Sequence, residues 1–281
     1  MGCVDYWCNA FTPDRRALWD AAVEEQGLSV KVRRDATDSF TDAATMVARM
    51  DELDLDVLLL PTADVPEDAG PHAYERYASS WSELMALCES HPRRFRGLWS
   101  FDPTGVGGLQ RAAEALAHPA CVGLHLHTHS FDRAFDHREL YPFYALAAER
   151  DVPVVMQAGA SGGRLPSECG RPIGIDRPAL YFGAVRFVLS HTGWPWTDEA
   201  LAMVQKHANV FLGTAAFPAN HWSPALAAFV RGAGRGKVLF GTSFPVVGHR
   251  HGLSRLEALD LPDDAREALL GGAARRVFKE L

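Results

Sequence analysis

Three histidines are the residues in this chain whose type and spacing best suit chemistry. His125 and His127 form a His-x-His pair, and His191 follows a separate apolar run. Imidazole titrates near neutral pH and is also a common metal ligand. Three such rings facing one cavity would suit an open site for zinc or another divalent metal. Without a metal, His127 and His191 are candidates for the acid and base of a proton-transfer reaction.

Neutral hydrogen-bonding side chains accompany these histidines. Asn9, Gln157 and Ser243 each follow an apolar run, and such groups can bind a substrate or a developing oxyanion. We predict three catalytic residues, namely His191, His127 and Ser243. We predict six substrate contacts, namely Asn9, Trp7, His125, Gln157, Trp194 and Arg164. The alternatives are a core position for His125, packing over the rim for Trp194 and a solvated loop charge for Arg164.

Composition and charge exclude several classes of protein. Of the 281 residues, 47% are hydrophobic, which is enough apolar material for a large core. The net charge of −7 and the scattered basic residues argue against a nucleic-acid partner. No apolar run approaches the roughly 20 residues that span a bilayer, so no membrane partner is expected. The five cysteines form no CxxC pair and the first residues form no apolar signal, so we expect free thiols in the cytoplasm.

The elements that must position these residues follow from the hydrophobic pattern. Eight short apolar runs, most of them β-branched or aromatic, predict buried strands at 3–7, 56–60, 95–101, 122–127, 152–157, 185–190, 209–213 and 237–242. Amphipathic stretches predict helices at 39–53, 81–91, 108–117, 141–150, 197–207 and 223–230. A closing helical pair is predicted at 254–260 and 262–281.

This alternation predicts a (β/α)8 TIM-like barrel, an α/β fold with a C-terminal helical extension. The alternative, an open dinucleotide-binding sheet, would need a Gly-rich turn after the first strand, where the chain instead has Cys8-Asn9-Ala10. No segment resembles a linker, so residues 1–281 are predicted to form a single domain. In such barrels the active site lies at the carboxyl ends of the strands, which is where the candidate residues fall.

Longer segments of the chain resemble the amidohydrolase-related family (amidohydrolase 2), which includes the aminocarboxymuconate-semialdehyde decarboxylase group. They are GLHLH (123–127), YPFYALAAERDVPVVMQAG (141–159), VLSHTGWPWTDEALAMVQKHANVFLGTAA (188–216) and KVLFGTSFP (237–245). The resemblance covers nearly the whole chain. It implies a (β/α)8 barrel, a divalent metal at the strand ends, and hydrolase or nonoxidative decarboxylase activity on a small carboxylated or ring-containing molecule.

The chain departs from the family pattern at most of the metal-ligand positions. The first-strand His-x-His is replaced by Trp7 and Asn9, the fifth-strand histidine by Gln157 and the eighth-strand aspartate by Ser243, whereas His191 is retained. The resemblance therefore implies a degenerate metal site and no assured cofactor. The alternative that stays open is zinc or another divalent metal bound by His125, His127 and His191.

Two functions are compatible with these residues. The first is an amidohydrolase-like enzyme with hydrolase or decarboxylase-type lyase chemistry, in which histidines serve as acid and base. The second is a non-catalytic relative that binds a ligand or a partner protein. Three of the four replacements are polar, and a barrel without activity would be expected to fill such positions with apolar residues. This favours the enzyme, with a small-molecule substrate, and the resemblance also points to a homodimer.

Overall fold

The barrel is built from eight parallel strands that follow one another in chain order. The computed structural model describes residues 2–25, 39–62, 79–279 and 281. The strands are β1 (Cys3–Asp5), β2 (Leu55–Pro61), β3 (Phe95–Ser100), β4 (Cys121–Leu126), β5 (Val154–Met156), β6 (Phe187–Leu189), β7 (Val210–Gly213) and β8 (Val238–Leu239). Every predicted strand is therefore present, and the (β/α)8 fold class is confirmed.

The first and last strands meet through the segments that follow them. The backbone N–H of Tyr6 donates to the carbonyl of Phe240 at 3.1 Å, and Cys8 forms a parallel bridge with Phe244. We call these two segments, residues 6–9 and 240–244, the seam. The seam nearly closes the barrel and places the chain after β1 beside the chain after β8.

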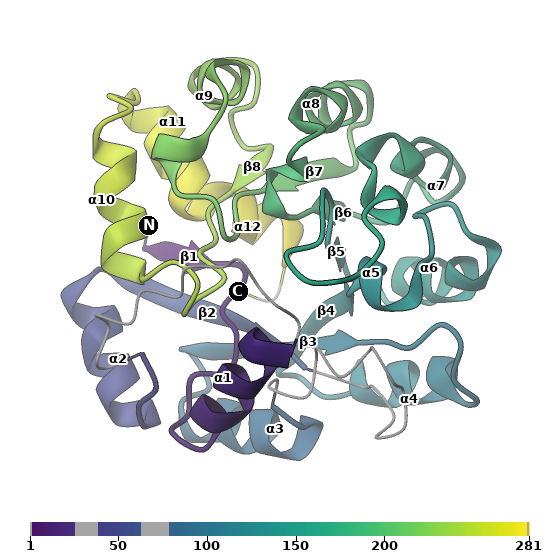
Figure 1. Cartoon of the computed structure of the whole chain (residues 1–281), viewed down its shortest axis with the longest axis horizontal. Coiled ribbons are helices and arrows are strands. Elements are labelled where there is room, and N and C mark those ends of the chain that lie inside the picture. Colours follow the sequence, from purple (N-terminus) through teal and green to yellow (C-terminus); the bar gives the residue numbers. More distant parts are fainter. Residues whose placement is uncertain (1, 26–38, 63–78, 280) are drawn as a thin grey trace.

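Helices surround the strands, as Figure 1 shows. They are α1 (Arg15–Glu25), α2 (Ala43–Glu52), α3 (Trp81–Ser90), α4 (Gly108–Ala115), α5 (Thr128–Phe131), α6 (Tyr141–Glu149), α7 (Asp176–Tyr181), α8 (Thr197–Lys206), α9 (Pro224–Arg231), α10 (His249–Glu257), α11 (Asp263–Glu267) and α12 (Ala273–Val277). A π-helical turn, Ala268–Gly272, joins α11 to α12. Within the described residues, no helix is both long enough and apolar enough to cross a membrane.

Local chemistry explains where several of these helices begin. Ser80 and Glu83 form a capping box at the start of α3, in which each side chain accepts from the other residue's backbone N–H. The side chain of Asp42 accepts from the N–H of Thr45 at 2.8 Å and caps α2. These caps satisfy N–H groups that have no partner within the helix.

The barrel interior is apolar at its amino end and polar at its carboxyl end. Its apolar residues form one cluster that includes Val4, Tyr6, Val57, Leu59, Leu98, Val155, Val188, Phe211 and Leu239. Val277 and Phe278, at the end of α12, belong to the same cluster and close the amino end. The buried polar side chains of the barrel interior, such as His125, Gln157 and Asn9, lie at its carboxyl end, together with the Trp7 indole.

Some elements differ from the sequence prediction. β1 ends at Asp5 rather than at residue 7, because the N–H of Trp7 turns to the Asp5 side chain (3.0 Å) instead of to a neighbouring strand. Helix α10 begins at His249, five residues before the helix predicted at 254–260. The pattern also missed α1 and α7, and α7 has only six residues, including Pro178.

Candidate active site

The seam links three predicted site residues by hydrogen bonds. The indole N–H of Trp7 donates to Asn9 Oδ1 at 3.1 Å. Asn9 Nδ2 donates to both the hydroxyl and the backbone carbonyl of Ser243, at 3.2 and 3.1 Å. The backbone N–H of Ser243 donates in turn to the carbonyl of Trp7 at 2.8 Å. Both polar atoms of the buried Asn9 amide are therefore engaged within the seam.

The indole of Trp7 also contacts two of the three histidines. Its ring lies 4.6 Å from the imidazole of His125 and 4.8 Å from that of His191, between ring centroids. Both contacts are edge-on, with interplanar angles of 88° and 84°. Because His125 lies on β4 and His191 follows β6, Trp7 reaches from the seam to the opposite side of the barrel. The structure thus brings the seam and the histidines together.

Hydroxyl groups hold the two histidines of the His-x-His pair. Nδ1 of His125 is hydrogen-bonded to Ser100 Oγ, and Nδ1 of His127 to Ser130 Oγ, both at 2.6 Å. Ser100 ends the adjacent strand β3, whereas Ser130 lies in the short helix α5 that follows His127. These bonds fix the ring orientations.

Burial keeps all three imidazoles neutral at pH 7. It lowers the pKa of His125 to about 3, with a further contribution from His191. It lowers the pKa of His191 to about 3 as well, aided by His129. The pKa of His127 is also lowered by burial and by the neighbouring histidines. Desolvation disfavours the charged form of histidine, and each nearby imidazole adds to this effect.

Several buried polar atoms around these histidines have no hydrogen-bond partner among the described residues. They include Nε2 of His125, Nδ1 of His191 and Oε1 of Gln157. These three residues lie on or just after β4, β5 and β6, which are neighbours in the barrel. An unpaired buried donor or acceptor costs about 1–3 kcal/mol, so such a group calls for an explanation. Three of them at the carboxyl end of one sheet fit a place for a polar ligand.

The outer predicted contacts lie at the surface. Trp194, in the loop after β6, is 53% exposed, and its ring lies 6.1 Å from that of Phe217. Arg164 is exposed in the loop after β5. Their roles in substrate binding stay predictions.

Two buried features of this region were not predicted from the sequence. His129 donates from Nε2 to the carbonyl of Gly159 at 2.8 Å, and its ring lies 5.9 Å from that of His127. Its position two residues after His127 was the available signal. Beneath the seam, the fully buried Asp5 faces Nε2 of His249 at 3.2 Å and accepts from the N–H of Thr242. An acidic residue in a buried strand was the signal for this pair.

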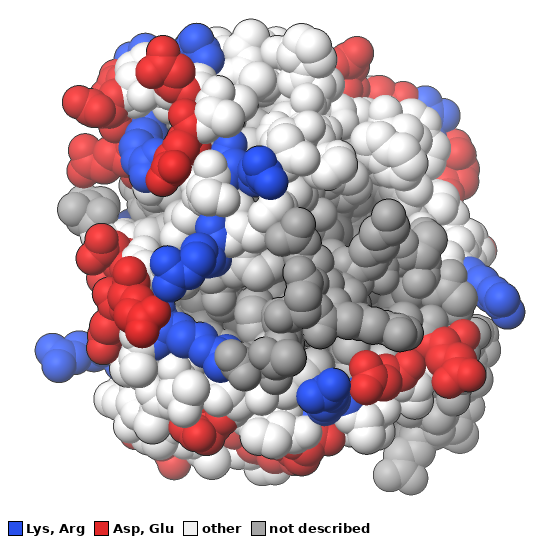
Figure 2. All heavy atoms as spheres, turned by 60° about the vertical axis from the view of Figure 1, so that its left-hand side comes forward, with Lys and Arg blue, Asp and Glu red and all other residues white. Residues whose placement is uncertain are grey.

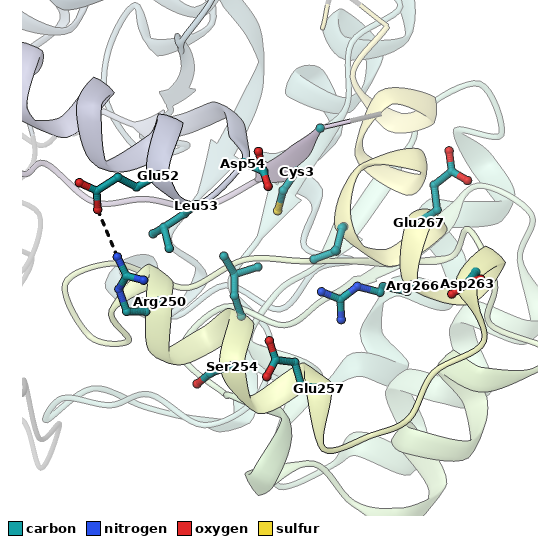
Figure 3. A pocket seen from close by; sticks show the side chains of 13 residues that line it. Cys3, Glu52, Leu53, Asp54, Arg250, Ser254, Glu257, Asp263, Arg266 and Glu267 are labelled. Carbon is teal, nitrogen blue, oxygen red and sulfur yellow. Dashed lines mark hydrogen bonds and ion pairs between the residues drawn. The ribbon is translucent and has the colours of Figure 1, made fainter.

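A separate cavity of about 690 Å³ lies at the opposite end of the strands. Figure 3 shows it between α2, α10 and α11, with Cys3 and Asp54 at its inner side. Cys3 opens β1 and Asp54 precedes β2, so the cavity is distant from the carboxyl-end residues. Two of its lining residues, Arg250 on α10 and Glu52 on α2, form an ion pair with 3.2 Å between Nη2 and Oε2. Acidic and basic side chains are interspersed on the face of the molecule that Figure 2 presents.

A model of the amidohydrolase family matches residues 4–279 of the sequence. The chain belongs to the amidohydrolase family. A sequence comparison with curated proteins found no match to this chain.

Solved structures share its fold at low sequence identity. An uncharacterised TIM-barrel protein from Bordetella bronchiseptica is 19% identical, with a TM-score of 0.78, over 100% of this chain and 99% of that one. 2,6-Dihydroxybenzoate decarboxylase from Rhizobium is 16% identical, with a TM-score of 0.70, over 99% of both chains. 5-Carboxyvanillate decarboxylase from Novosphingobium aromaticivorans is 15% identical, with a TM-score of 0.72, over 99% of this chain and 96% of that one. The last structure contains manganese and 4-hydroxy-3-methoxy-5-nitrobenzoic acid.

Proposed function

We propose that this amidohydrolase-family chain is a decarboxylase-type lyase acting on a small carboxylated aromatic molecule. The observation that carries the proposal is the set of buried, unpaired polar atoms on His125, Gln157 and His191 at the carboxyl ends of three neighbouring strands. The amide oxygen of Gln157 can accept from a ring hydroxyl, and an imidazole N–H of His125 or His191 can donate to a carboxylate oxygen. The decarboxylases among the fold neighbours support the same reaction class.

The reaction requires a proton at the carbon that carries the carboxylate. That carbon is protonated, the bond to the carboxylate breaks, carbon dioxide leaves, and the electron pair of the broken bond restores the ring. We assign the proton transfer to His191, because it is only partly buried and can be reprotonated from solvent. Its pKa of about 3 rises when a substrate carboxylate lies beside it, since an opposite charge favours the protonated form.

The other residues then bind and orient the substrate. His127, whose Nδ1 is held by Ser130, accepts a hydrogen bond or a proton from a ring hydroxyl. The hydroxyl of Ser243 accepts from Asn9, which leaves its own proton to donate to a substrate oxygen. Hydrolysis is the less favoured chemistry, because imidazoles with strongly lowered pKa values are weak bases for activating water.

A non-catalytic ligand-binding relative is the second candidate. The observation in its favour is that Trp7, Asn9 and Ser243 already satisfy one another's hydrogen bonds across the seam. In that case the site would bind a carboxylated ring without turning it over.

Turnover assays with carboxylated aromatics distinguish the two candidates. The purified protein would be incubated with a panel that includes 2,6-dihydroxybenzoate and 5-carboxyvanillate, and carbon dioxide release would be followed alongside ligand binding by calorimetry. We expect turnover that is lost in His191→Asn and kept in His118→Asn, a matched change in a surface histidine between α4 and β4. Binding without turnover across the panel would establish the ligand-binding relative instead.

A further inference from the structure

Trp7 contacts two of the imidazoles that would have to turn toward a metal ion bound at this site. Manganese is present in the Novosphingobium aromaticivorans neighbour, so a divalent metal is the group that the fold would lead one to expect. Protein-bound ions of this kind need several N or O donors, with nitrogen atoms about 2.0–2.1 Å from a zinc ion. Here His125 and His191 each lie against the Trp7 indole instead.

The donors on the seam side of the site do not fit an ion either. Indole has no lone pair that can coordinate a metal. Asn9 Oδ1 already accepts from Trp7, and Asn9 Nδ2 donates to Ser243, so both polar atoms of the amide are hydrogen-bonded within the seam. Neutral hydroxyl and amide oxygens are weak ligands for such metals without a charged partner. Among the residues that the structure describes, no group of three or more His, Cys, Asp or Glu side chains is placed to hold a metal ion.

We infer that this site works without a divalent metal, because the Trp7 indole packs against the imidazoles of both His125 and His191, and the side chains of Asn9 and Ser243 are bonded to each other. The seam holds the indole there through the Trp7–Asn9–Ser243 hydrogen bonds. A neutral indole is thus the group that both imidazoles contact on the seam side of the site. This inference concerns metal binding and does not depend on which reaction the protein catalyses.

Metal binding can be measured directly on the tag-free protein. The wild type and a Trp7→His/Asn9→His/Ser243→Asp variant would be equilibrated with Mn²⁺ or Co²⁺, and bound metal would be measured by elemental analysis and by the visible absorption of Co²⁺. We expect no ion at this site in the wild type and about one ion per chain in the variant, since the variant removes the indole and supplies three charged or imidazole ligands.

Two further measurements keep the inference testable if the triple variant folds poorly. The thermal midpoint of the wild type is expected to be unchanged by excess Mn²⁺, because a metal that bound the native state would raise it. If the wild type binds some metal, the same amount should remain bound in His191→Ala. That result would place the metal outside this site and would agree with the inference. Stoichiometric metal in the wild type that is lost in His191→Ala would overturn it. A folded triple variant that takes up no metal would also overturn the role given to the indole.

Discussion

The free energy of unfolding should fall in mild acid, because burial lowers the pKa of His125 in the folded protein. The side chain is 3% exposed, and its pKa falls from 6.5 to about 3 in the folded protein. Because the unfolded chain binds the proton more tightly, acid favours unfolding. The stabilising contribution is complete above pH 6.5 and is lost as the pH falls from there toward 3. Between pH 7 and pH 5 this one histidine should account for about 2 kcal/mol of the free energy of unfolding.

The assay is urea unfolding at pH 7, 6 and 5 for the wild type and His125→Asn. Asparagine keeps a polar atom near Ser100 but cannot take up a proton, so the variant should lose about 2 kcal/mol less than the wild type over this range. Val155→Ala is the control for loss of stability alone. It lies in the barrel interior on β5, and it should lower the free energy of unfolding equally at every pH. Parallel pH dependences for the wild type and His125→Asn would refute the reasoning.

Three further outcomes are expected. Asn9→Ala should lower the free energy of unfolding in urea by about 1–3 kcal/mol, because the indole N–H of Trp7 and the hydroxyl of Ser243 each lose their hydrogen bond to Asn9. An unchanged urea midpoint would contradict a stabilising role for these bonds. Asp5→Asn should lower the free energy of unfolding by about 1–3 kcal/mol in the same assay, because both oxygens of the buried Asp5 carboxylate accept from Thr242 and an amide nitrogen cannot accept. A loss below about 1 kcal/mol would show that these bonds contribute little. Binding of a carboxylated aromatic at pH 7 should be accompanied by proton uptake, because the substrate carboxylate raises the pKa of His191. The uptake would be measured by calorimetry in buffers of different ionisation enthalpy, and it should disappear in His191→Asn. Uptake that persists in the variant would assign the proton to another group.

The strands of this barrel could be predicted from sequence because parallel strands buried on both faces appear as short apolar runs. Each run ended within a few residues of the strand found, and the polar residues after the runs lie at the carboxyl ends as expected. Helix α7 could not be found in this way, because its six residues include Pro178 and are too few to show a period. Helix α10 begins at His249 with a polar sequence that resembles a loop.

The position of several candidate residues at the carboxyl end of the barrel could be predicted from sequence, whereas their contacts could not. Side-chain alternation along a regular strand placed His125 correctly inside the barrel. Alternation fails after Tyr6, where the backbone of Trp7 turns to Asp5 and the chain enters the seam. The contact between the Trp7 indole and two imidazoles depends on that bend and on residues more than 100 positions away. No local pattern encodes such a contact, which is why it appears only in the three-dimensional structure.

The hydrogen bonds across the seam also constrain how this protein can change. Trp7, Asn9 and Ser243 come from opposite ends of the chain, yet each holds a buried polar group of the next. Replacing Trp7 or Asn9 leaves a buried polar group of its neighbour without that hydrogen bond, so the effects of substitutions within the seam should be strongly non-additive. A change from this seam to a metal-binding one would therefore have to pass through less stable single variants or alter several of these residues at once. The hydrogen bonds between the segments after β1 and β8 therefore limit which single substitutions the carboxyl end of the barrel can accept.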